Sequence, residues 1–241
     1  SFFRKGRRVE AYKDCFIEKV RPRLIITTID NNTIFYKISG RHPDLKTLFI
    51  QNGLRTYYGC SFEELDHFHS DILSALFVDY MLVFGSAVGD RFSKYIEGNI
   101  VQTGSLKNNF MGEEMPTQAG TIAIISEWRS DEGQFLAGTF FSFEDFYMRP
   151  DKLVIQCIVD YAKEKNKQLV IIPAMRNSSD LIIQEKAYFR ELMGREPKFL
   201  RPPGPYPGYL AVDSVEILVA LESTLVYESI ARGKKGAIFP I

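Results

Sequence analysis

Residues 216–241 read EILVALESTLVYESIARGKKGAIFPI and predict two strands joined by a helix. The run 216–221 is apolar and of strand length, 224–232 has the length of a short helix, and 236–241 is apolar again. Two parallel strands need a crossover connection, which is usually a helix. A strand, a helix and a strand in close succession therefore predict a βαβ unit and an α/β fold with a parallel sheet.

The same alternation recurs along the rest of the chain. Further strands are predicted at 24–29, 46–50, 80–84, 100–103, 121–126, 168–172 and 198–201. Helices are predicted from Ser61 and at 88–95, 152–165, 180–193 and 209–214. Because the strands are almost continuously apolar, we expect parallel sheets that are covered on both faces.

A stretch without periodicity interrupts this pattern at 106–120, and we interpret it as a linker. The fold class that follows is two Rossmann-like lobes with parallel sheets, an N-terminal lobe at 1–115 and a C-terminal lobe at 116–241. Neither lobe contains the GxGxxG fingerprint of standard dinucleotide-binding folds. The chain opens without a first strand and stops at the end of a strand, so we expect it to be truncated at one or both ends, with a minimal natural version of the fold as the alternative.

Composition excludes several classes of function. The 30 basic and 30 acidic residues leave no net charge, which disfavours nucleic acid as a partner, since such binding needs a basic face. The three cysteines are far apart, which fits a reducing cytoplasm, and no spacing suggests a metal site. No apolar run reaches the roughly 20 residues that span a bilayer. The basic opening at 4–8 is interpreted as a solvated terminus, with peripheral contact to acidic lipid at the inner face of the membrane as the alternative.

The best candidate for a ligand site is Glu222-Ser223-Thr224, between the strand at 216–221 and the next helix. Ligands of open α/β sheets bind beyond the carboxyl ends of strands. The unpaired N–H groups of a helix start favour a phosphate there. Glu228, one turn further on, suits the paired hydroxyls of a ribose. The alternative is that Ser223 merely caps the helix and Glu228 is solvated.

A family resemblance points the same way. Residues 223–235, STLVYESIARGKK, resemble the nucleotide-sugar segment of GT-B glycosyltransferases. The segments QNGLR at 51–55, VFGS at 83–86 and TGSLKNN at 103–109 resemble bacterial surface carbohydrate biosynthesis proteins, which are distantly related to the transferases of Kdo and other nonulosonic acids. The resemblance spans 24–241. It implies a GT-B fold and transfer of a sugar from a nucleotide-activated donor, with a CMP-nonulosonic acid as one donor, to a surface polysaccharide. No DxD-type metal motif stands out in the sequence, which is consistent with metal-independent transfer that a helix N-terminus assists.

Three further loops of the second lobe follow predicted strands. Glu127 and Arg129 come after the strand at 121–126; the carboxylate suits a base or a sugar hydroxyl, and the guanidinium suits a donor phosphate. Arg176 follows the strand at 168–172 and can neutralise a phosphate. Arg201 opens a proline-rich loop that can wall a nucleobase site. Ordinary loops are the alternative at each place.

Two places in the first lobe carry candidate acceptor or catalytic residues. Gln51, Asn52 and Arg55 follow the strand at 46–50. The side-chain amides of Gln51 and Asn52 suit sugar hydroxyls. Asp66 and His67 are candidates for a general base, because the pKa of histidine lies near neutral pH. Adjacent helical residues point about 100° apart, however, so a structural role is the favoured interpretation of this pair.

Three functions remain open. The leading one is a cytoplasmic glycosyltransferase that takes a nucleotide-sugar as substrate, needs no separate cofactor, and transfers the sugar to a glycan or glycolipid acceptor. The second is a nucleotide-sugar epimerase of the UDP-N-acetylglucosamine 2-epimerase type, which needs no acceptor. The third is a non-catalytic GT-B remnant that acts as a binding module.

Overall fold

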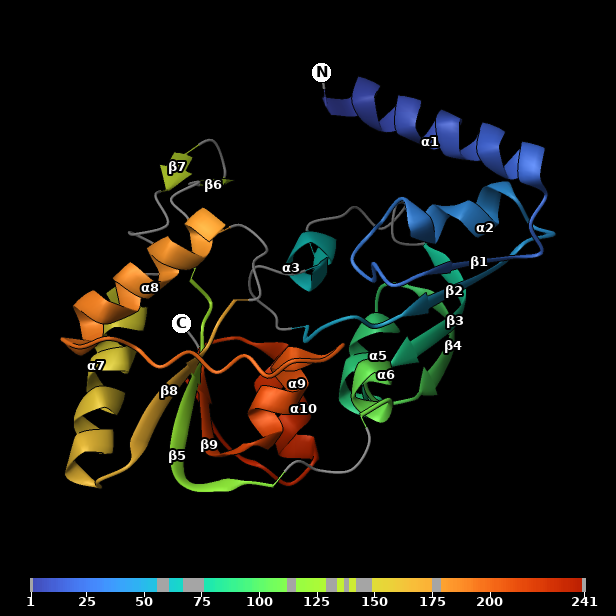
Figure 1. Ribbon diagram of the computed structural model, residues 1–241. Helices are drawn as coiled ribbons and strands as arrows, with labels where there is room; N and C mark the ends of the chain where they lie inside the picture. The colour runs from blue at the N-terminus through green and yellow to red at the C-terminus, as the bar shows by residue number, and fades with distance from the viewer. Residues whose placement is uncertain are drawn as a thin grey trace. The chain divides into compact units, whose positions relative to one another are not determined.

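The computed structural model describes residues 2–55, 61–66, 76–111, 116–128, 134–136, 139–141, 149–174 and 179–239. It divides the chain into two compact units, Ser1–Phe110 and Met111–Ile241. Each unit is built around its own four-stranded parallel sheet (Figure 1). Two Rossmann-like parallel sheets are the fold class that the sequence predicts.

The first unit carries, in chain order, the helices and strands α1 (Phe2–Val20), β1 (Leu24–Thr27), the 3-10 helix η1 (Phe35–Lys37), α2 (Ile38–Arg41), β2 (Lys46–Ile50), α3 (Ser61–Asp66), β3 (Phe77–Val83), α5 (Ser86–Phe92), β4 (Glu97–Gln102) and α6 (Leu106–Asn109). The strand order across the sheet is β1-β2-β3-β4. Each strand therefore lies beside its neighbour in the sequence.

This order places the helices between the strands on one face of the sheet. Crossovers between parallel strands are right-handed, so crossovers that all advance in one direction lie on the same side. The aromatic core shows the result. Phe49 of β2 packs against Tyr36 of η1 and Phe92 of α5, and Phe62 of α3 packs against Phe92. All four rings are buried.

The opposite face of this sheet stays partly exposed. Ile26 pairs with Leu48, and Leu48 pairs with Tyr80, so the three side chains form a row across the strands. Ile26 is 55% exposed and Tyr80 is 42% exposed. The expectation that both faces are covered is therefore wrong for the described residues of the first unit, because one-directional crossovers supply helices to one face alone.

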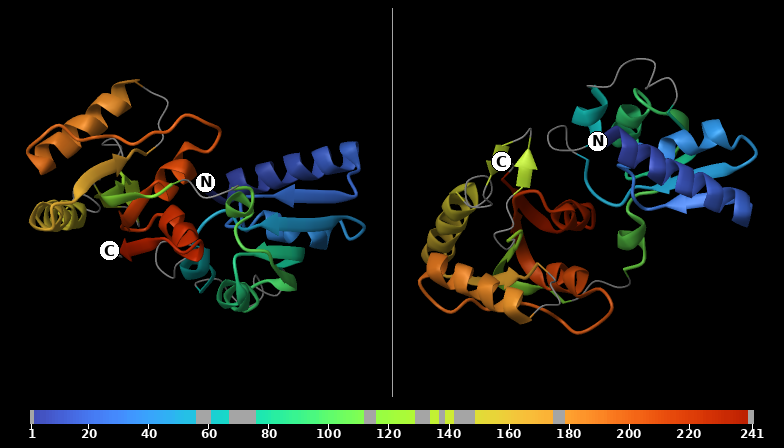
Figure 2. Two further views of the ribbon diagram at one scale, coloured as in Figure 1. Left: turned by 60° about the horizontal axis from the view of Figure 1, so that its bottom comes forward. Right: turned by 90° about the horizontal axis from the view of Figure 1, so that it is seen from above.

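The helix α1 was not predicted from the sequence, which placed a solvated terminus at 4–8. The structure has one helix over Phe2–Val20. It ends at Val20, because the next residue, Arg21, adopts a left-handed conformation with φ of 52° and is followed by a proline. Ile17 is buried in the core, and Asp14 binds Arg41 and His42 beside α2. Figure 2 shows α1 passing the β1 edge of the sheet.

The second unit carries β5 (Gln118–Ile125), β6 (Gln134–Leu136), β7 (Thr139–Phe141), α7 (Arg149–Glu164), β8 (Gln168–Ile172), α8 (Ser179–Met193), α9 (Pro207–Asp213), β9 (Val215–Ala220), α10 (Thr224–Ala231) and β10 (Lys235–Ile238). The strands β6 and β7 form a small antiparallel pair. The main sheet is parallel in the order β10-β9-β5-β8.

Helices cover this second sheet on both faces (Figure 1). On one face, Ile155 of α7 and Phe189 of α8 belong to the same apolar cluster as Ile122 of β5. On the other face, Val212 of α9 and Val226 of α10 belong to the same apolar cluster as Ala123 of β5, whose side chain points to the face opposite that of Ile122. Here the prediction of a sheet covered on both faces is confirmed.

Two predicted segments differ from the structure. The strand predicted at 198–201 is a single bridge, between Phe199 and Ile171, because the prolines that follow at 202 and 203 lack the N–H groups that extend a ladder. The linker predicted at 106–120 contains α6, capped by the Ser105 hydroxyl, which accepts the N–H of Asn108 at 3.3 Å. The same stretch also contains the start of β5 at Gln118.

A buried carboxylate joins the inner strands of the first sheet. Asp79 of β3 accepts the ammonium group of Lys46 at 2.7 Å and the backbone N–H of Thr47 at 2.9 Å, both on β2. Burial raises the pKa of the Asp79 carboxyl, but the hydrogen bonds from Lys46 and Thr47 outweigh this effect and hold the pKa below its usual value. The ionised form is therefore the one that stabilises the fold.

We predict that Asp79→Asn lowers the free energy of unfolding near neutral pH by about 1–3 kcal/mol, because the charge-assisted bonds are lost. A lowered pKa contributes stability above the unfolded-state pKa and loses it as the pH falls through the folded-state value. The difference between wild type and variant should therefore shrink in acid. Urea unfolding over a pH series measures it, with Glu97→Gln on the exposed strand β4 as the control. A difference that stays constant down to acidic pH contradicts the prediction.

Candidate functional site

The strand order of the second sheet defines one special position. From β5 the chain crosses through α7 to β8 on one side, whereas from β9 it crosses through α10 to β10 on the other side. The helices α7 and α10 lie on opposite faces. The connections therefore diverge between β5 and β9, and open α/β sheets bind ligands beyond the carboxyl ends of the strands at such a switch point.

Glu127 and Glu222 meet at this position. Ile124 and Val219 are in register, so β5 and β9 end level with each other. The Glu127 carboxylate accepts the backbone N–H of Glu222 at 2.8 Å. The residues around Glu127 fix its loop: Ser126 donates its N–H to Ile172 at 2.9 Å, and the Ser126 hydroxyl accepts the N–H of buried Trp128 at 3.3 Å. The structure thus joins two candidate residues from loops that are 95 positions apart.

The helix α10 starts at the same edge. Ser223 is its N-cap residue, in an extended conformation, but within the described structure its side chain makes no capping hydrogen bond to α10. The alternative of simple capping by the Ser223 hydroxyl therefore fails. The N–H groups of a first helical turn lack the partners four residues earlier that later turns have, and in α10 the N–H of Val226 donates instead to the Ser223 carbonyl at 3.2 Å. Ser223 and Thr224, both half-buried, accordingly place two hydroxyls beside donors that suit an anion.

Glu228 is not solvated. The residue is 6% exposed, and its Oε2 accepts the hydroxyl of Tyr209 on α9 at 2.7 Å. One turn further, Arg232 pairs with buried Asp213 and lies over the Tyr209 ring, with its Cζ atom 5.6 Å from the ring centroid. Glu228 therefore belongs to a polar network that joins α9 to α10 next to the candidate site.

Glu185 is a buried polar residue that the sequence analysis does not single out. This residue of α8 is fully buried, and its Oε1 accepts the backbone N–H of Ala174 just beyond the end of β8 at 3.0 Å. Its Oε2 has no hydrogen-bond partner within the described structure. A detectable signal existed, because Glu185 shares its helical face with Leu181 and Phe189, one turn away on either side. A carboxylate on an apolar face usually has a specific role.

The structure places some of the predicted site residues and not others. His67, Arg129 and Arg176 lie outside the described residues. Arg201 is exposed, in the loop between the Phe199 bridge and α9. Of the residues predicted to bind the donor, the structure brings Glu222, Ser223 and Thr224 together beside Glu127, with Glu228 behind them on α10.

The acceptor candidates of the first unit also lie at the carboxyl ends of strands. Gln51, after β2, is buried, and both ends of its amide are engaged: the oxygen accepts the N–H of Phe84, and the nitrogen donates to the carbonyl of Gly53, each at 2.8 Å. Asn52 is exposed, and its side-chain oxygen accepts the ammonium group of Lys107 at 2.7 Å. The Gln51 amide therefore links two strand ends, while Asn52 faces solvent.

Arg55 neutralises a buried carboxylate that the sequence did not single out. Asp30, after β1, is fully buried and accepts the Nε and Nη2 groups of Arg55 and the backbone N–H of Asn52. Asp66, the other predicted residue of this unit, is exposed at the end of α3 and accepts the hydroxyl of Tyr95. Its predicted partner His67 is outside the described residues, so the structure does not test this pair as a dyad.

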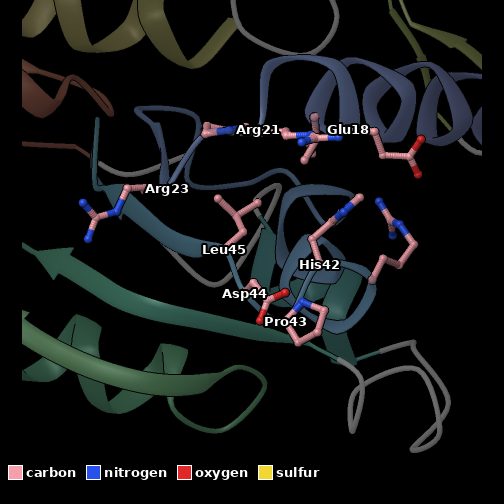
Figure 3. Close-up of a pocket in the computed structure, with 10 residues that line it drawn as sticks. Glu18, Arg21, Arg23, His42, Pro43, Asp44 and Leu45 are labelled. Carbon is pink, nitrogen blue, oxygen red and sulfur yellow. The ribbon is translucent and has the colours of Figure 1, made fainter.

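A hollow of about 710 Å³ lies at the opposite edge of the first sheet, where β1 and β2 begin (Figure 3). Its lining includes the apolar Ile17 and Leu45 and the charged Arg21, Arg23 and Asp44. Figure 3 shows Arg23 and Glu18 pointing to opposite ends of it. This hollow lies at the amino ends of the strands, whereas α/β sheets bind ligands beyond the carboxyl ends.

Two features are absent from the part of the chain that the structure describes. Within the ranges that the structure describes, no group of three or more histidine, cysteine, aspartate or glutamate side chains is arranged to hold a metal ion. Within the same ranges, no helix has the length and apolar character needed to cross a membrane.

The two parallel sheets and the switch point between β5 and β9 define the chain as an α/β protein with Rossmann-like units. A family model described as "putative O-antigen biosynthesis protein" matches residues 48–241. The chain belongs to this O-antigen biosynthesis family, and membership supports a role in surface carbohydrate biosynthesis, as the resemblance implied. No curated protein matches the chain. The matched residues include the whole second sheet but neither α1 nor β1.

We predict that Tyr209→Phe lowers the free energy of unfolding by about 1–3 kcal/mol, because it removes a hydrogen bond to the buried Glu228 carboxylate. Tyr206→Phe is the matched control, since Tyr206 lies in the same segment and is 47% exposed. Urea unfolding of both variants measures the difference. Equal stability of the two would show that the bond between Tyr209 and Glu228 does not hold α9 to α10.

Proposed function

We propose that the chain is a glycosyltransferase that binds the nucleotide of an activated sugar donor at the carboxyl edge of the second sheet. The observation that carries this proposal is the position of the α10 N-terminus, which opens at the switch point beside the loop of Glu127. Membership of the O-antigen biosynthesis family supports a carbohydrate substrate. The proposal includes the assignment of the two Rossmann-like units to the GT-B class of glycosyltransferases.

The donor phosphate is proposed to bind at Ser223 and Thr224. A phosphate in this position gains the N–H groups of the first turn, the two hydroxyls and the positive end of the helix dipole. These donors stabilise the charge that develops on the leaving phosphate when the glycosidic bond breaks. Such stabilisation needs no metal, and the proposed reaction is therefore metal-independent.

The neighbouring residues have distinct proposed roles. Glu127, whose carboxylate is held against the N–H of Glu222, binds a sugar hydroxyl or acts as the base. Arg129 and Arg176 are proposed to neutralise the donor phosphate, and the proline-rich loop that Arg201 opens is proposed to form one wall of the nucleobase site. Glu228 is proposed to orient the nucleoside through the network that it forms with Tyr209.

The acceptor, a glycan or glycolipid, is assigned to the first unit in this proposal. Asn52 and Lys107 form an exposed polar pair that suits sugar hydroxyls. Gln51 and Arg55 support them by fixing the loop, since their side chains bond to Phe84 and Asp30. Asp66 and His67 remain the alternative base.

We predict that the double variant Ser223→Ala, Thr224→Ala binds nucleotide about tenfold or more weakly, because hydrogen bonds to charged groups contribute about 1.5–3 kcal/mol each. Calorimetric titration with CMP, CDP, UMP, UDP and GDP measures the loss and also identifies the donor nucleotide. Ser93→Ala, at the far end of α5 in the first unit, is the control. Wild-type affinity in the double variant excludes the α10 site.

Turnover of the selected donor then separates the candidate functions. Donor consumption that requires a glycan acceptor and persists in a chelator supports metal-independent glycosyl transfer. Release of free sugar without any acceptor identifies the epimerase alternative instead. Binding of nucleotide with no consumption of the donor identifies a non-catalytic binding module.

A further inference from the structure

The helix α1 presents an apolar stripe to solvent. Val9, Tyr12, Phe16 and Val20 are 44%, 72%, 59% and 53% exposed. Their spacing of three, four and four residues places them on one face of the helix, within an arc of about 80°. Large apolar side chains scattered singly over a surface are ordinary, but a continuous row of four along one helix marks an interaction surface.

The charged residues of α1 are sorted around this stripe. Lys13 and Lys19 flank it, each at about 60° from Phe16 on opposite sides. The three acidic residues Glu10, Asp14 and Glu18 fall on the opposite side of the helix. The whole helix has six basic and three acidic residues, an excess of three positive charges, and its first turns contain the basic run at 4–8. Over residues 9–20, the part of the helix whose side chains are described, lysines therefore border the apolar stripe, and the acidic residues lie away from it.

Contacts with the rest of the unit fix this orientation. Ile17 is 7% exposed and belongs to the core cluster of the first unit. Asp14 binds Arg41 at 3.0 Å and His42 at 3.0 Å. Both contacts come from the side of α1 that faces away from the stripe. The hydrogen bonds hold the pKa of the Asp14 carboxyl below its usual value against the opposing effect of burial, so the anchor is charged at neutral pH.

We propose that the stripe of α1 docks on the surface of an anionic lipid bilayer. An interfacial helix has an apolar face with aromatic residues, bordered by lysine and arginine that bind anionic headgroups. A second copy of the chain fits the surface less well, because two such stripes in contact bring two positively charged helices together. The proposal goes beyond the proposed transfer reaction, and α1 lies outside the residues that the family model matches.

Co-sedimentation with lipid vesicles tests the proposal on the full chain. We expect binding to vesicles of phosphatidylcholine mixed with phosphatidylglycerol, and little binding to phosphatidylcholine alone or at high salt. Phe16→Asp, and separately the pair Lys13→Glu and Lys19→Glu, should each weaken binding about tenfold or more. The controls are Leu153→Asp on α7, where Leu153 is 71% exposed, and the pair Lys94→Glu and Lys163→Glu, which makes the same change in net charge.

Two measurements make the outcome decisive. Urea unfolding of Phe16→Asp should give the wild-type free energy of unfolding, because Phe16 is 59% exposed, and this shows that the variant is folded. Sedimentation without lipid should show the same mass for wild type and variant. Equal vesicle binding by wild type and variants overturns the proposal, and so does a wild-type dimer that Phe16→Asp dissociates, because the stripe then faces a second copy.

Discussion

The handedness of parallel crossovers is the constraint on which both units depend. In the first sheet every strand follows its sequence neighbour in one direction, so the connecting helices lie on one face and the row of Ile26, Leu48 and Tyr80 lies on the other. In the second sheet the direction reverses after β8, and the chain returns past β5 to β9, so α7 and α10 cover opposite faces. The reversal creates the position where Glu127 meets Glu222. One stereochemical rule thus gives the first unit an uncovered face and the second unit a ligand position.

Within each unit, buried carboxylates hold the loops at the strand ends. Asp30 fixes the segment of Asn52 and Arg55 after β2, and Glu185 fixes the backbone after β8. Such groups are costly to bury unless hydrogen-bonded, so they restrict their loops to one arrangement. Loops held in this way can present backbone N–H groups and hydroxyls at defined positions, which is what recognition of a phosphorylated sugar requires.

The sequence predicted most of the strands because a parallel strand needs a run of apolar residues, and the runs at 46–50 and 168–172 correspond to β2 and β8 residue for residue. It did not predict α1, because the basic residues at 4–8 obscured the helical spacing of Val9, Tyr12 and Phe16. The position of Glu222, Ser223 and Thr224 at the ligand-binding edge of the sheet was also predictable, because ligands of open α/β sheets bind beyond the carboxyl ends of the strands. The partners of Glu228 and Asp30 were not, because those hydrogen bonds join residues of different elements and have no local pattern.

The strand order also has a consequence for synthesis on the ribosome. The first sheet can assemble in step with the growing chain, since each new strand pairs with the one made just before it. The second sheet cannot, because β5 is made first but lies between β8 and β9. Its apolar edges therefore wait for strands that emerge roughly 50 and 100 residues later, and unpaired strand edges are the parts of a nascent chain most prone to aggregate. The edges of β5 are therefore the part of the second sheet that stays unpaired for longest during synthesis, at a stage when all strands of the first sheet have already been made.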